Sequence, residues 1–274
     1  MDSILNIAHR GARSLAPENT LVAARKALDV GADMWELDVA LTADGVPYLV
    51  HDDTLERTSN VAEVFPERRP WPCHAFTIAE IRQLDFGSWF NQRDPFGQIA
   101  AGQVSEADQQ SYIGEPAPTL EEALAFTRDH NWRVNVEIKD ASGTPGDADI
   151  VAKVVGLIER MTMIERVLIS SFNHTYLKQV KARNPRLTTG ALIEYSLAEP
   201  LPLLYELAAD ALHPQAGLFP LDVITAWRDA GFGVNIWTVN DPVQMKALVE
   251  ARVSGIFTDF PQTLHSILYS STSV

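Results

Sequence analysis

The sequence has little cysteine, little positive charge and no long apolar run. Cys73 is the only cysteine among 274 residues, so no disulfide can form within the chain and a thiolate metal site is not expected. Its 22 Lys and Arg residues are outnumbered by 36 Asp and Glu, which gives a formal net charge of -14 at pH 7. Nucleic acids and anionic membrane surfaces bind basic faces, so neither is expected as a partner.

The amino-terminal stretch MDSILNIAHR lacks the basic segment and the apolar run of about 7–15 residues that mark a secretory signal. No run approaches the roughly 20 apolar residues of a membrane span. We therefore expect a cytoplasmic protein with no stable membrane association. With 46% hydrophobic residues the chain can bury a large core. Its length suits one α/β barrel of about 250 residues, so residues 1–274 are predicted to form a single domain.

Short apolar segments of strand length alternate with helical patterns along the chain. The strand-like segments are 4–9, 34–39, 133–139, 166–171, 188–193, 209–213, 232–239 and 255–259. The helical segments include 17–30, 119–130, 147–160, 174–183 and 241–251. Helix-start signals support the latter, such as Thr119 followed three residues later by Glu122. Eight βα units predict a (β/α)8 TIM barrel with its active site at the carboxyl ends of the strands.

Two features interrupt this alternation. A turn signal at Asp44-Gly45 followed by another apolar run predicts a hairpin over residues 35–51. Residues 54–118 have no clear βα pattern and are far longer than an ordinary connection between a strand and a helix. We predict that they form a small insertion lobe after the second strand, over the mouth of the barrel.

Glu36 and Asp38 alternate with apolar residues in the stretch WELDV. In a strand both carboxylates point to one face, while Trp35, Leu37 and Val39 point to the other. We expect the apolar face to meet the helices and the two acids to face the barrel interior. Ionised groups are costly there unless they are paired or bind a cation.

The stretch NVEIK repeats the pattern, because Asn135, Glu137 and Lys139 share one face. Glu137 is therefore a third carboxylate on an inner strand face. Three such acids make an oxygen-rich site suited to Mg²⁺ or Ca²⁺. The spacing is also typical of acids that pair with neighbouring bases inside a barrel, so both interpretations stay open at this point.

His9 follows the first predicted strand and His51 ends the hairpin, so both are expected at the barrel mouth. Each histidine taken singly is as typical of a structural role as of a catalytic one. Arg10 and Lys139 are suited either to a bound phosphate or to pairing with the carboxylates. Trp237 shares an inner strand face with Asn235 and is either a pocket wall or part of the core.

Three further residues are expected to have lesser roles. Asn19 and Thr20 fall in the first turn of the predicted helix 17–30, where we expect hydrogen bonds between loop and helix. Phe172 is expected in the core or in a lid.

The ordered motifs of this chain resemble those of the glycerophosphodiester phosphodiesterase family. The motifs are HRG, PENT, ELDVALTADGVPYLVHDDTLERTSN, EIK, SSF and WTVN. No single motif is specific, but the ordered set is, and it extends from Ile7 to about Asp259. The poorest match is residues 60–115, which in this family lie over the active site and vary.

The resemblance implies a role for each candidate residue. Glu36, Asp38 and Glu137 are then the ligands of one divalent cation, Mg²⁺ or Ca²⁺. His9 and His51 are the acid–base pair, and Arg10 and Lys139 contact the phosphate. The implied reaction is metal-dependent hydrolysis of a small-molecule glycerophosphodiester to glycerol 3-phosphate and an alcohol.

Two alternatives come from different substrate and function classes. A phosphodiesterase of lysophospholipids or sphingomyelin on the same barrel would need an apolar trough, whereas the insertion is mostly polar. A barrel that only binds phosphodiesters should lack part of the residue set, and all of it is present. The sequence leaves open the preferred alcohol, the choice of Mg²⁺ or Ca²⁺, the roles of the two histidines, the nucleophile and the number of subunits.

Overall fold

The computed structural model describes residues 4–195 and 199–269 of the chain. Its strands are β1 (Leu5–Ala8), β2 (Met34–Leu41), β3 (Pro47–Leu49), β4 (Val134–Ile138), β5 (Val167–Ser171), β6 (Thr188–Ile193), β7 (Ala211–Pro214), β8 (Gly233–Ile236) and β9 (Gly255–Thr258). Its helices are α1 (Leu21–Asp29), α2 (Val61–Val64), α3 (Ile78–Ile81), α4 (Ser88–Arg93), α5 (Glu106–Tyr112), α6 (Leu120–Asp129), α7 (Ile150–Arg160), α8 (His174–Arg183), α9 (Pro200–Leu207), α10 (Leu221–Asp229), α11 (Pro242–Glu250) and α12 (Pro261–Tyr269). Short 3₁₀ helices cover Pro66–Arg68, Cys73–Ala75 and Ile164–Arg166.

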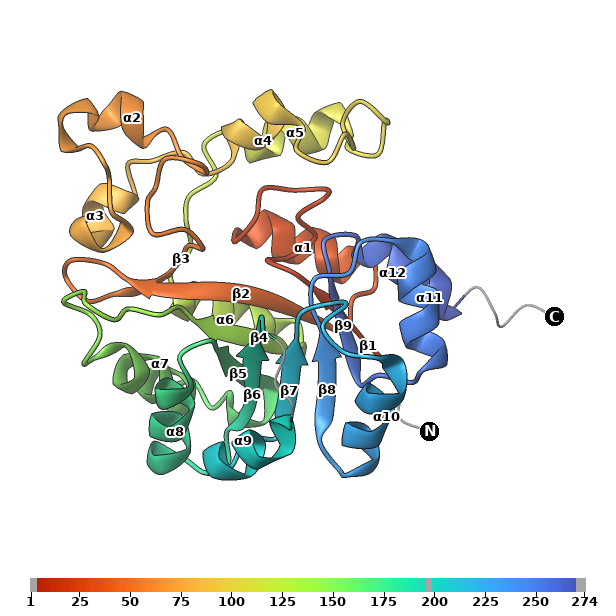
Figure 1. The fold of residues 1–274 in the computed structure, drawn as a ribbon. Coiled ribbons are helices and arrows are strands. Elements are labelled where there is room, and N and C mark those ends of the chain that lie inside the picture. Colours follow the sequence, from red (N-terminus) through yellow and green to blue (C-terminus); the bar gives the residue numbers. More distant parts are fainter. Residues whose placement is uncertain (1–3, 196–198, 270–274) are drawn as a thin grey trace.

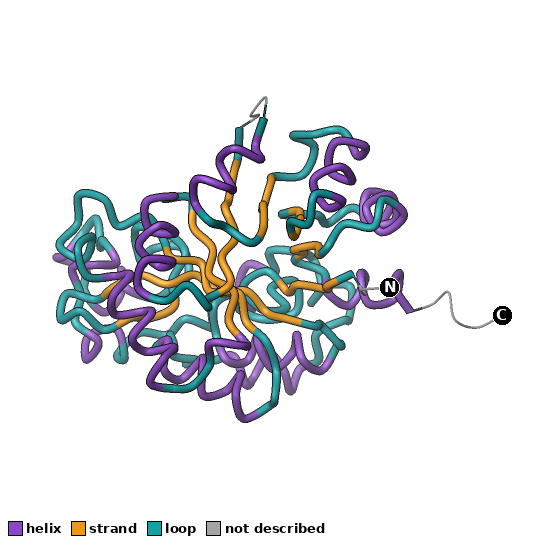
Figure 2. The backbone as a smooth tube through the Cα atoms, turned by 90° about the horizontal axis from the view of Figure 1, so that it is seen from below, coloured by secondary structure: helices purple, strands orange, loops and turns teal. Residues whose placement is uncertain are grey.

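Eight parallel strands of the described chain close into a barrel. β1 pairs with both β9 and β2, so the sheet has no open edge between its first and last strands. The helices surround this central ring of strands, as Figure 2 shows. All eight predicted parallel strands are present, and the fold is the expected (β/α)8 TIM barrel. The predicted hairpin is confirmed as well, because β3 pairs antiparallel with β2, with Val39 opposite Leu49.

The strands bury one face against the helices and the other inside the barrel. Trp35, Leu37 and Val39 of β2 belong to the large core between strands and helices, as the alternation in the sequence predicts. The ring of Trp35 stacks on that of Trp132 at a centroid distance of 6.3 Å. The inner faces of three strands carry a small apolar cluster, formed by Ile7 of β1, Met34 of β2 and Phe257 of β9. The acids of β2 therefore follow an apolar layer along the inner face.

A buried histidine fills part of the barrel interior. His213 of β7 has no solvent exposure, and the side-chain amide of Asn235 donates a hydrogen bond to its Nε2 at 3.0 Å. Burial without a charged partner lowers the pKa of His213 to about 3, so its ring is neutral at pH 7. Gly190 makes room for this ring, because a Cβ at Gly190 would lie 2.4 Å from the imidazole.

Two predicted helix starts are wrong by a few residues. The predicted helix 17–30 begins at Leu21, because Asn19 has a positive φ of 57° and Thr20 is extended and caps the helix. The Thr20 side chain accepts the expected hydrogen bond from the helix, at Ala23 N–H, but neither residue lies in the first helical turn. The predicted helix 147–160 begins at Ile150.

The insertion lobe, residues 54–118, contains α2 to α5, which lie above β2 and β3 in Figure 1. Its first part encloses its own apolar cluster, which includes Leu55, Trp71 and Phe76. Its second part joins the main core instead, through Phe90 of α4 and Tyr112 of α5 among others. The lobe is therefore continuous with the barrel. In the described part of the chain, no helix has the length and apolar character needed to cross a membrane.

Candidate active site

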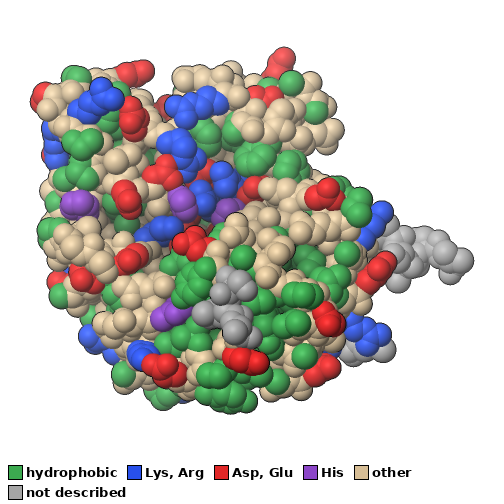
Figure 3. Space-filling model, in the orientation of Figure 1, with side chains coloured by type: hydrophobic (Ala, Val, Ile, Leu, Met, Phe, Trp, Pro, Cys, Tyr) green, Lys and Arg blue, Asp and Glu red, His purple; other side chains and the backbone are tan. Residues whose placement is uncertain are grey.

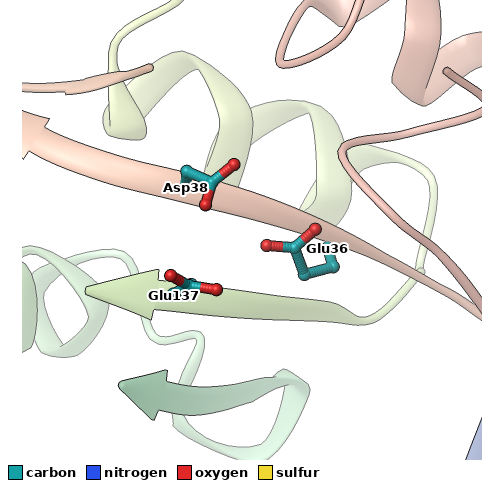
Figure 4. A group of neighbouring side chains, drawn as sticks. All are labelled: Glu36, Asp38 and Glu137. Atoms are coloured by element: carbon teal, nitrogen blue, oxygen red, sulfur yellow. The ribbon is translucent and has the colours of Figure 1, made fainter. Parts of the chain in front are cut away.

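Three carboxylates converge on the inner face of the barrel. Glu36 and Asp38 project from β2 and Glu137 from β4, and their side chains point toward one another in Figure 4. Asp38 lies directly opposite Glu137 in the parallel register of these strands. One carboxylate oxygen from each residue lies within 4.8 Å of the others. The prediction that the three acids lie together on the inner surface of the barrel is therefore confirmed.

The environment of these acids suits a bound cation. Burial, followed by the charges of Asp38 and Glu137, raises the pKa of Glu36 well above its ordinary value. Burial and Asp38 likewise raise the pKa of Glu137. Glu36 Oε1 is buried and has no hydrogen-bond partner among the described residues. An oxygen-binding cation such as Mg²⁺ or Ca²⁺ would relieve both the repulsion and the unsatisfied oxygen.

The loop after β1 brings basic groups to these acids. Arg10 N–H donates a hydrogen bond to Glu36 Oε2 at 2.8 Å, and its guanidinium Nε lies 3.2 Å from Asp38 Oδ2. Gly11 has a φ of 81°, and a Cβ there would lie 2.7 Å from the backbone of Ala23, so only glycine fits. This explains the glycine that follows Arg10 in the sequence.

Two further polar residues hold the acids in place. The Asn19 side chain donates a hydrogen bond to Asp38 Oδ2 at 2.8 Å, and its Oδ1 accepts one from Asp38 N–H. Lys139 Nζ lies 2.9 Å from Glu137 Oε1 and 3.5 Å from Asp38 Oδ1. Burial raises the pKa of Asp38, but Arg10 and Lys139 outweigh it and hold that pKa well below its usual range. Asp38 is therefore ionised at neutral pH.

His9 is oriented by an acid at the end of the last strand. Its Nδ1 lies 2.7 Å from Asp259 Oδ1, and Asn240 donates a hydrogen bond to Asp259 Oδ2. Because a carboxylate only accepts hydrogen bonds, the Nδ1 atom carries the proton and Nε2 keeps its lone pair. Burial and the neighbouring charge of Arg10 lower the pKa of His9. His9 is therefore a neutral base at pH 7.

His51 has a matching arrangement on the other side of the site. Its Nδ1 lies 2.6 Å from Asp52 Oδ1, and Arg57 of the insertion lobe holds Asp52 through two hydrogen bonds of 2.5 and 3.0 Å. Burial raises the pKa of Asp52, but the hydrogen bonds from His51 and Arg57 outweigh it and keep that pKa low. Asp52 is thus an anion that accepts a hydrogen bond from His51 Nδ1 and fixes the orientation of the ring.

Glu18 links the two histidine–carboxylate pairs. Its side chain is 3% exposed and accepts hydrogen bonds from Arg57 Nη2 at 2.7 Å and Arg57 Nη1 at 3.0 Å. It also accepts a bond from Arg10 at 2.8 Å and forms an ion pair with Arg13 at 2.9 Å. Arg13 lies 3.6 Å from Asp259, the partner of His9. One buried carboxylate therefore connects both ends of the site.

Two cavities border this site. The mouth cavity, of about 100 Å³, lies over the acids and is walled by Phe172 and Trp237, whose rings meet edge to face at 5.3 Å. The side pocket, of about 290 Å³, lies between the start of the insertion lobe and the loop after β4. Both are lined by His51. Histidine, basic and acidic side chains gather in the hollow between the lobe and the barrel in Figure 3. A larger cavity of about 800 Å³ lies at the opposite end of the barrel, by Leu5 and Gly233.

The structure brings all eight predicted site residues to one place. His9, Arg10, Glu36, His51, Glu137 and Trp237 line the mouth cavity, Asp38 lies beside Glu137, and Lys139 lines the adjoining side pocket. Four residues that orient these groups had no assigned role in the sequence analysis. They are Glu18, Asp52, Arg57 and Asp259.

The sequence did contain signals for some of them. Asp52 directly follows His51, and Asp259 directly follows β9, the strand that pairs with β1. These positions predict that each acid can pair with a histidine at the barrel mouth. The role of Arg57 depends on how the insertion folds back, which spacing does not reveal.

Comparisons with known proteins give the family. The sequence profile of the glycerophosphoryl diester phosphodiesterase family matches residues 9–263, nearly the whole chain. The chain belongs to this family. As a member it is a phosphoric diester hydrolase, and the resemblance seen in its motifs is confirmed.

Individual family members are similar over their full lengths. A glycerophosphodiester phosphodiesterase of Caldanaerobacter subterraneus subsp. tengcongensis is 35% identical over 264 residues, which cover 96% of this chain and 97% of that protein. A phosphodiesterase of Oleispira antarctica, solved in complex with the product sn-glycerol-3-phosphate, has a TM-score of 0.80 and 28% identity, over 96% of this chain and 95% of that one. A glycerophosphodiester phosphodiesterase of Agrobacterium tumefaciens has a TM-score of 0.74 and 27% identity, over 97% of this chain and 100% of that one.

Proposed function

We propose that the chain hydrolyses glycerophosphodiesters to glycerol 3-phosphate and an alcohol, with the help of one divalent cation. The observation that carries this proposal is the convergence of three inner carboxylates with two carboxylate-oriented histidines at one cavity. The product bound to the Oleispira antarctica phosphodiesterase supports the same substrate class.

In this proposal Glu36, Asp38 and Glu137 hold the cation. The all-oxygen donor set suits Mg²⁺ or Ca²⁺, and the raised pKa values of Glu36 and Glu137 fit a site that needs positive charge. The cation would neutralise the charge that builds up on the phosphate oxygens. Arg10 and Lys139, which lie against these acids, would bind the same oxygens from the protein side.

We assign opposite proton-transfer roles to the two histidines. His9 is the base that removes the proton of the nucleophile, because its Nδ1 is occupied by Asp259 and its pKa is lowered. His51 is the acid that protonates the departing alcohol, because Asp52 holds its ring in place and that ring borders both the mouth cavity and the side pocket. Each such assist contributes roughly 10²–10⁴ in rate.

The nucleophile is the glycerol 2-hydroxyl or water, and both need this residue set. Attack by the hydroxyl forms a cyclic phosphate, releases the alcohol and leaves a ring that water then opens. A tethered nucleophile has an effective molarity of roughly 10⁵ M or more, which favours this route. An analogue without the 2-hydroxyl separates the two, since only cyclisation depends on that group.

The metal requirement is tested by Glu137→Gln. Turnover of glycerophosphodiesters should fall to background, and calorimetric binding of Mg²⁺ or Ca²⁺ should weaken markedly, because one ionised ligand is lost. The metal-free variant should unfold at the same or a higher temperature than the parent, because removing a buried acid relieves repulsion. Parental activity of the variant in excess chelator would contradict the proposal.

We further propose that residues 1–274 form a single domain that acts in the cytoplasm on a substrate in solution. The continuity of the insertion lobe with the main core through Phe90 and Tyr112 supports one domain. The single cysteine gives no sign of an oxidising compartment, and the formal charge of -14 favours a substrate away from anionic membrane surfaces.

A further inference from the structure

The side pocket opens directly beside the proposed acid. It is lined on one side by His51, Asp52, Asp53 and Thr54, and on the other by residues 139–142 of the loop after β4. Its volume of about 290 Å³ is almost three times that of the mouth cavity, which is about 100 Å³. His51 borders both cavities, so a phosphate between them would direct one of its two esters toward each.

Two carboxylates that lie outside the proposed cation site, Asp53 and Asp140, line the side pocket. Asp140 accepts hydrogen bonds from Ser142 and Asn173, which lower its pKa, so it is ionised at neutral pH. The Asp53 side chain makes no hydrogen bond or ion pair with any described residue. The one lysine of the pocket, Lys139, is already engaged with Glu137 and Asp38. The available charges therefore attract a cation.

The remaining lining shows what kind of cation fits. Leu41, Ile150 and Ala141 supply apolar surface for a short carbon chain, and none of the side chains that line the pocket is a phenylalanine, tyrosine or tryptophan. Quaternary ammonium groups are typically bound by aromatic cages. Carboxylates instead favour a primary ammonium, whose N–H groups donate charge-assisted hydrogen bonds.

We propose that the side pocket binds the leaving alcohol, and that it selects a short alcohol with a primary ammonium group through Asp53 and Asp140. His51 then stands between the phosphate and this alcohol, where it can protonate the departing oxygen. The inference rests on the proposed function and adds the chemical class of the second ester group.

Three esters of glycerol 3-phosphate test the proposal, with ethanolamine, choline and 1-propanol as the alcohols. Propanol has a methyl group where ethanolamine has its ammonium, so the pair isolates the charge. With Mg²⁺ or Ca²⁺ present, kcat/KM should be about tenfold higher for the ethanolamine ester than for the propyl ester, which one charge-assisted hydrogen bond can supply. The ethanolamine ester should also exceed the choline ester.

The double variant Asp53→Asn, Asp140→Asn should bring the ethanolamine-to-propyl ratio close to one. The matched control is Asp129→Asn, Asp229→Asn, which removes the same charge from two exposed positions at the ends of α6 and α10. It should keep the parental ratio.

Equal kcat/KM values for the three esters in the parent would overturn the inference alone. So would a ratio that the double variant leaves unchanged, or a choline ester preferred to the ethanolamine ester. Hydrolysis of none of the esters would overturn the proposed function as well.

Discussion

At the residue scale, the two histidines depend on partners that set which ring nitrogen carries the proton. Asp259 accepts a hydrogen bond from His9 Nδ1, and Asp52 accepts one from His51 Nδ1. A histidine without such a partner can rotate or take the other tautomer, in which Nε2 no longer accepts a proton. The acids are thus positioning residues, and their effect should appear in turnover rather than in substrate binding.

Replacing Asp259 tests this dependence. In Asp259→Asn the amide can donate to His9 Nδ1 and favour the wrong tautomer, so kcat should fall by about 10²–10⁴-fold with little change in KM. Steady-state kinetics across pH 5–9 measure kcat and KM, and they show whether the acidic and basic limbs of the pH–rate profile shift. Asp129→Asn, at an exposed position of α6, is the control. A parental kcat in Asp259→Asn would show that His9 does not need this partner.

At the element scale, the insertion lobe is part of the site rather than a detachable cover. Arg57 reaches from the lobe to Glu18 and Asp52, and Tyr112 donates a hydrogen bond from its hydroxyl to Leu15 C=O at 2.8 Å. Deleting residues 54–118 would also remove Phe90 and Tyr112, which belong to the main core. Single substitutions are therefore the suitable probes of what the lobe does.

Arg57→Lys isolates the link between lobe and histidine. Lysine keeps the charge but cannot make the paired hydrogen bonds that Arg57 makes to both Glu18 and Asp52. We expect kcat/KM to fall by up to about 10²-fold, the usual effect of a misplaced catalytic group, with most of the loss in kcat. Arg82→Lys, an arginine of the same lobe that pairs with Glu122, should be near parental. Equal losses in both variants would indicate general destabilisation of the lobe instead.

Two glycines, Gly190 in β6 and Gly156 in α7, should respond to alanine in opposite ways. In Gly190→Ala the new Cβ would lie 2.4 Å from the buried ring of His213, so the free energy of unfolding should fall by about 1–3 kcal/mol. In Gly156→Ala, within α7, the nearest atom is the end of Arg160 at 3.5 Å, and the better helix former should raise it by about 0.5–1 kcal/mol. Urea unfolding measures both, and two changes of the same sign would contradict the packing around β6.

At the scale of the whole molecule, burial of an uncharged histidine couples folding to pH. The pKa of His213 is about 3 in the folded protein, against about 6.5 for an unfolded histidine. Between these values only the unfolded chain binds the extra proton, so acid favours unfolding. The contribution of His213 to the free energy of unfolding is therefore fully present above pH 6.5, and it is lost as the pH falls toward 3.

The slope of stability against pH should reveal this group. From pH 6 downward, His213 should lower the free energy of unfolding by up to about 1.4 kcal/mol per pH unit. His213→Gln keeps an acceptor for the Asn235 amide but does not titrate, so its slope should be shallower by the contribution of one proton. Urea unfolding at pH 7, 6 and 5 gives both slopes. Identical slopes would mean that His213 has the same pKa in the folded and unfolded states, so that burial does not lower it.

The sequence by itself determined the barrel and the residues to which we assign its chemistry. Period-two alternation in β2 and β4 placed Glu36, Asp38 and Glu137 on inner faces, because successive side chains of a strand point to opposite sides. The ends of the predicted first strand and of the hairpin also placed His9 and His51 at the barrel mouth. This alternation of side chains is the same in the folded protein, because it depends only on the backbone geometry of each strand.

Only the tertiary structure decided what surrounds those residues. The convergence of Arg57, Asp52 and Glu18 joins segments up to 39 residues apart, and the contact of Asp259 with His9 spans 250. The side pocket likewise needs the insertion lobe to lie against the loop after β4. These contacts form because the chain closes into a barrel and its insertion folds back onto it. Ion pairs between distant segments form only where packing brings the segments together. A local sequence pattern therefore does not predict them.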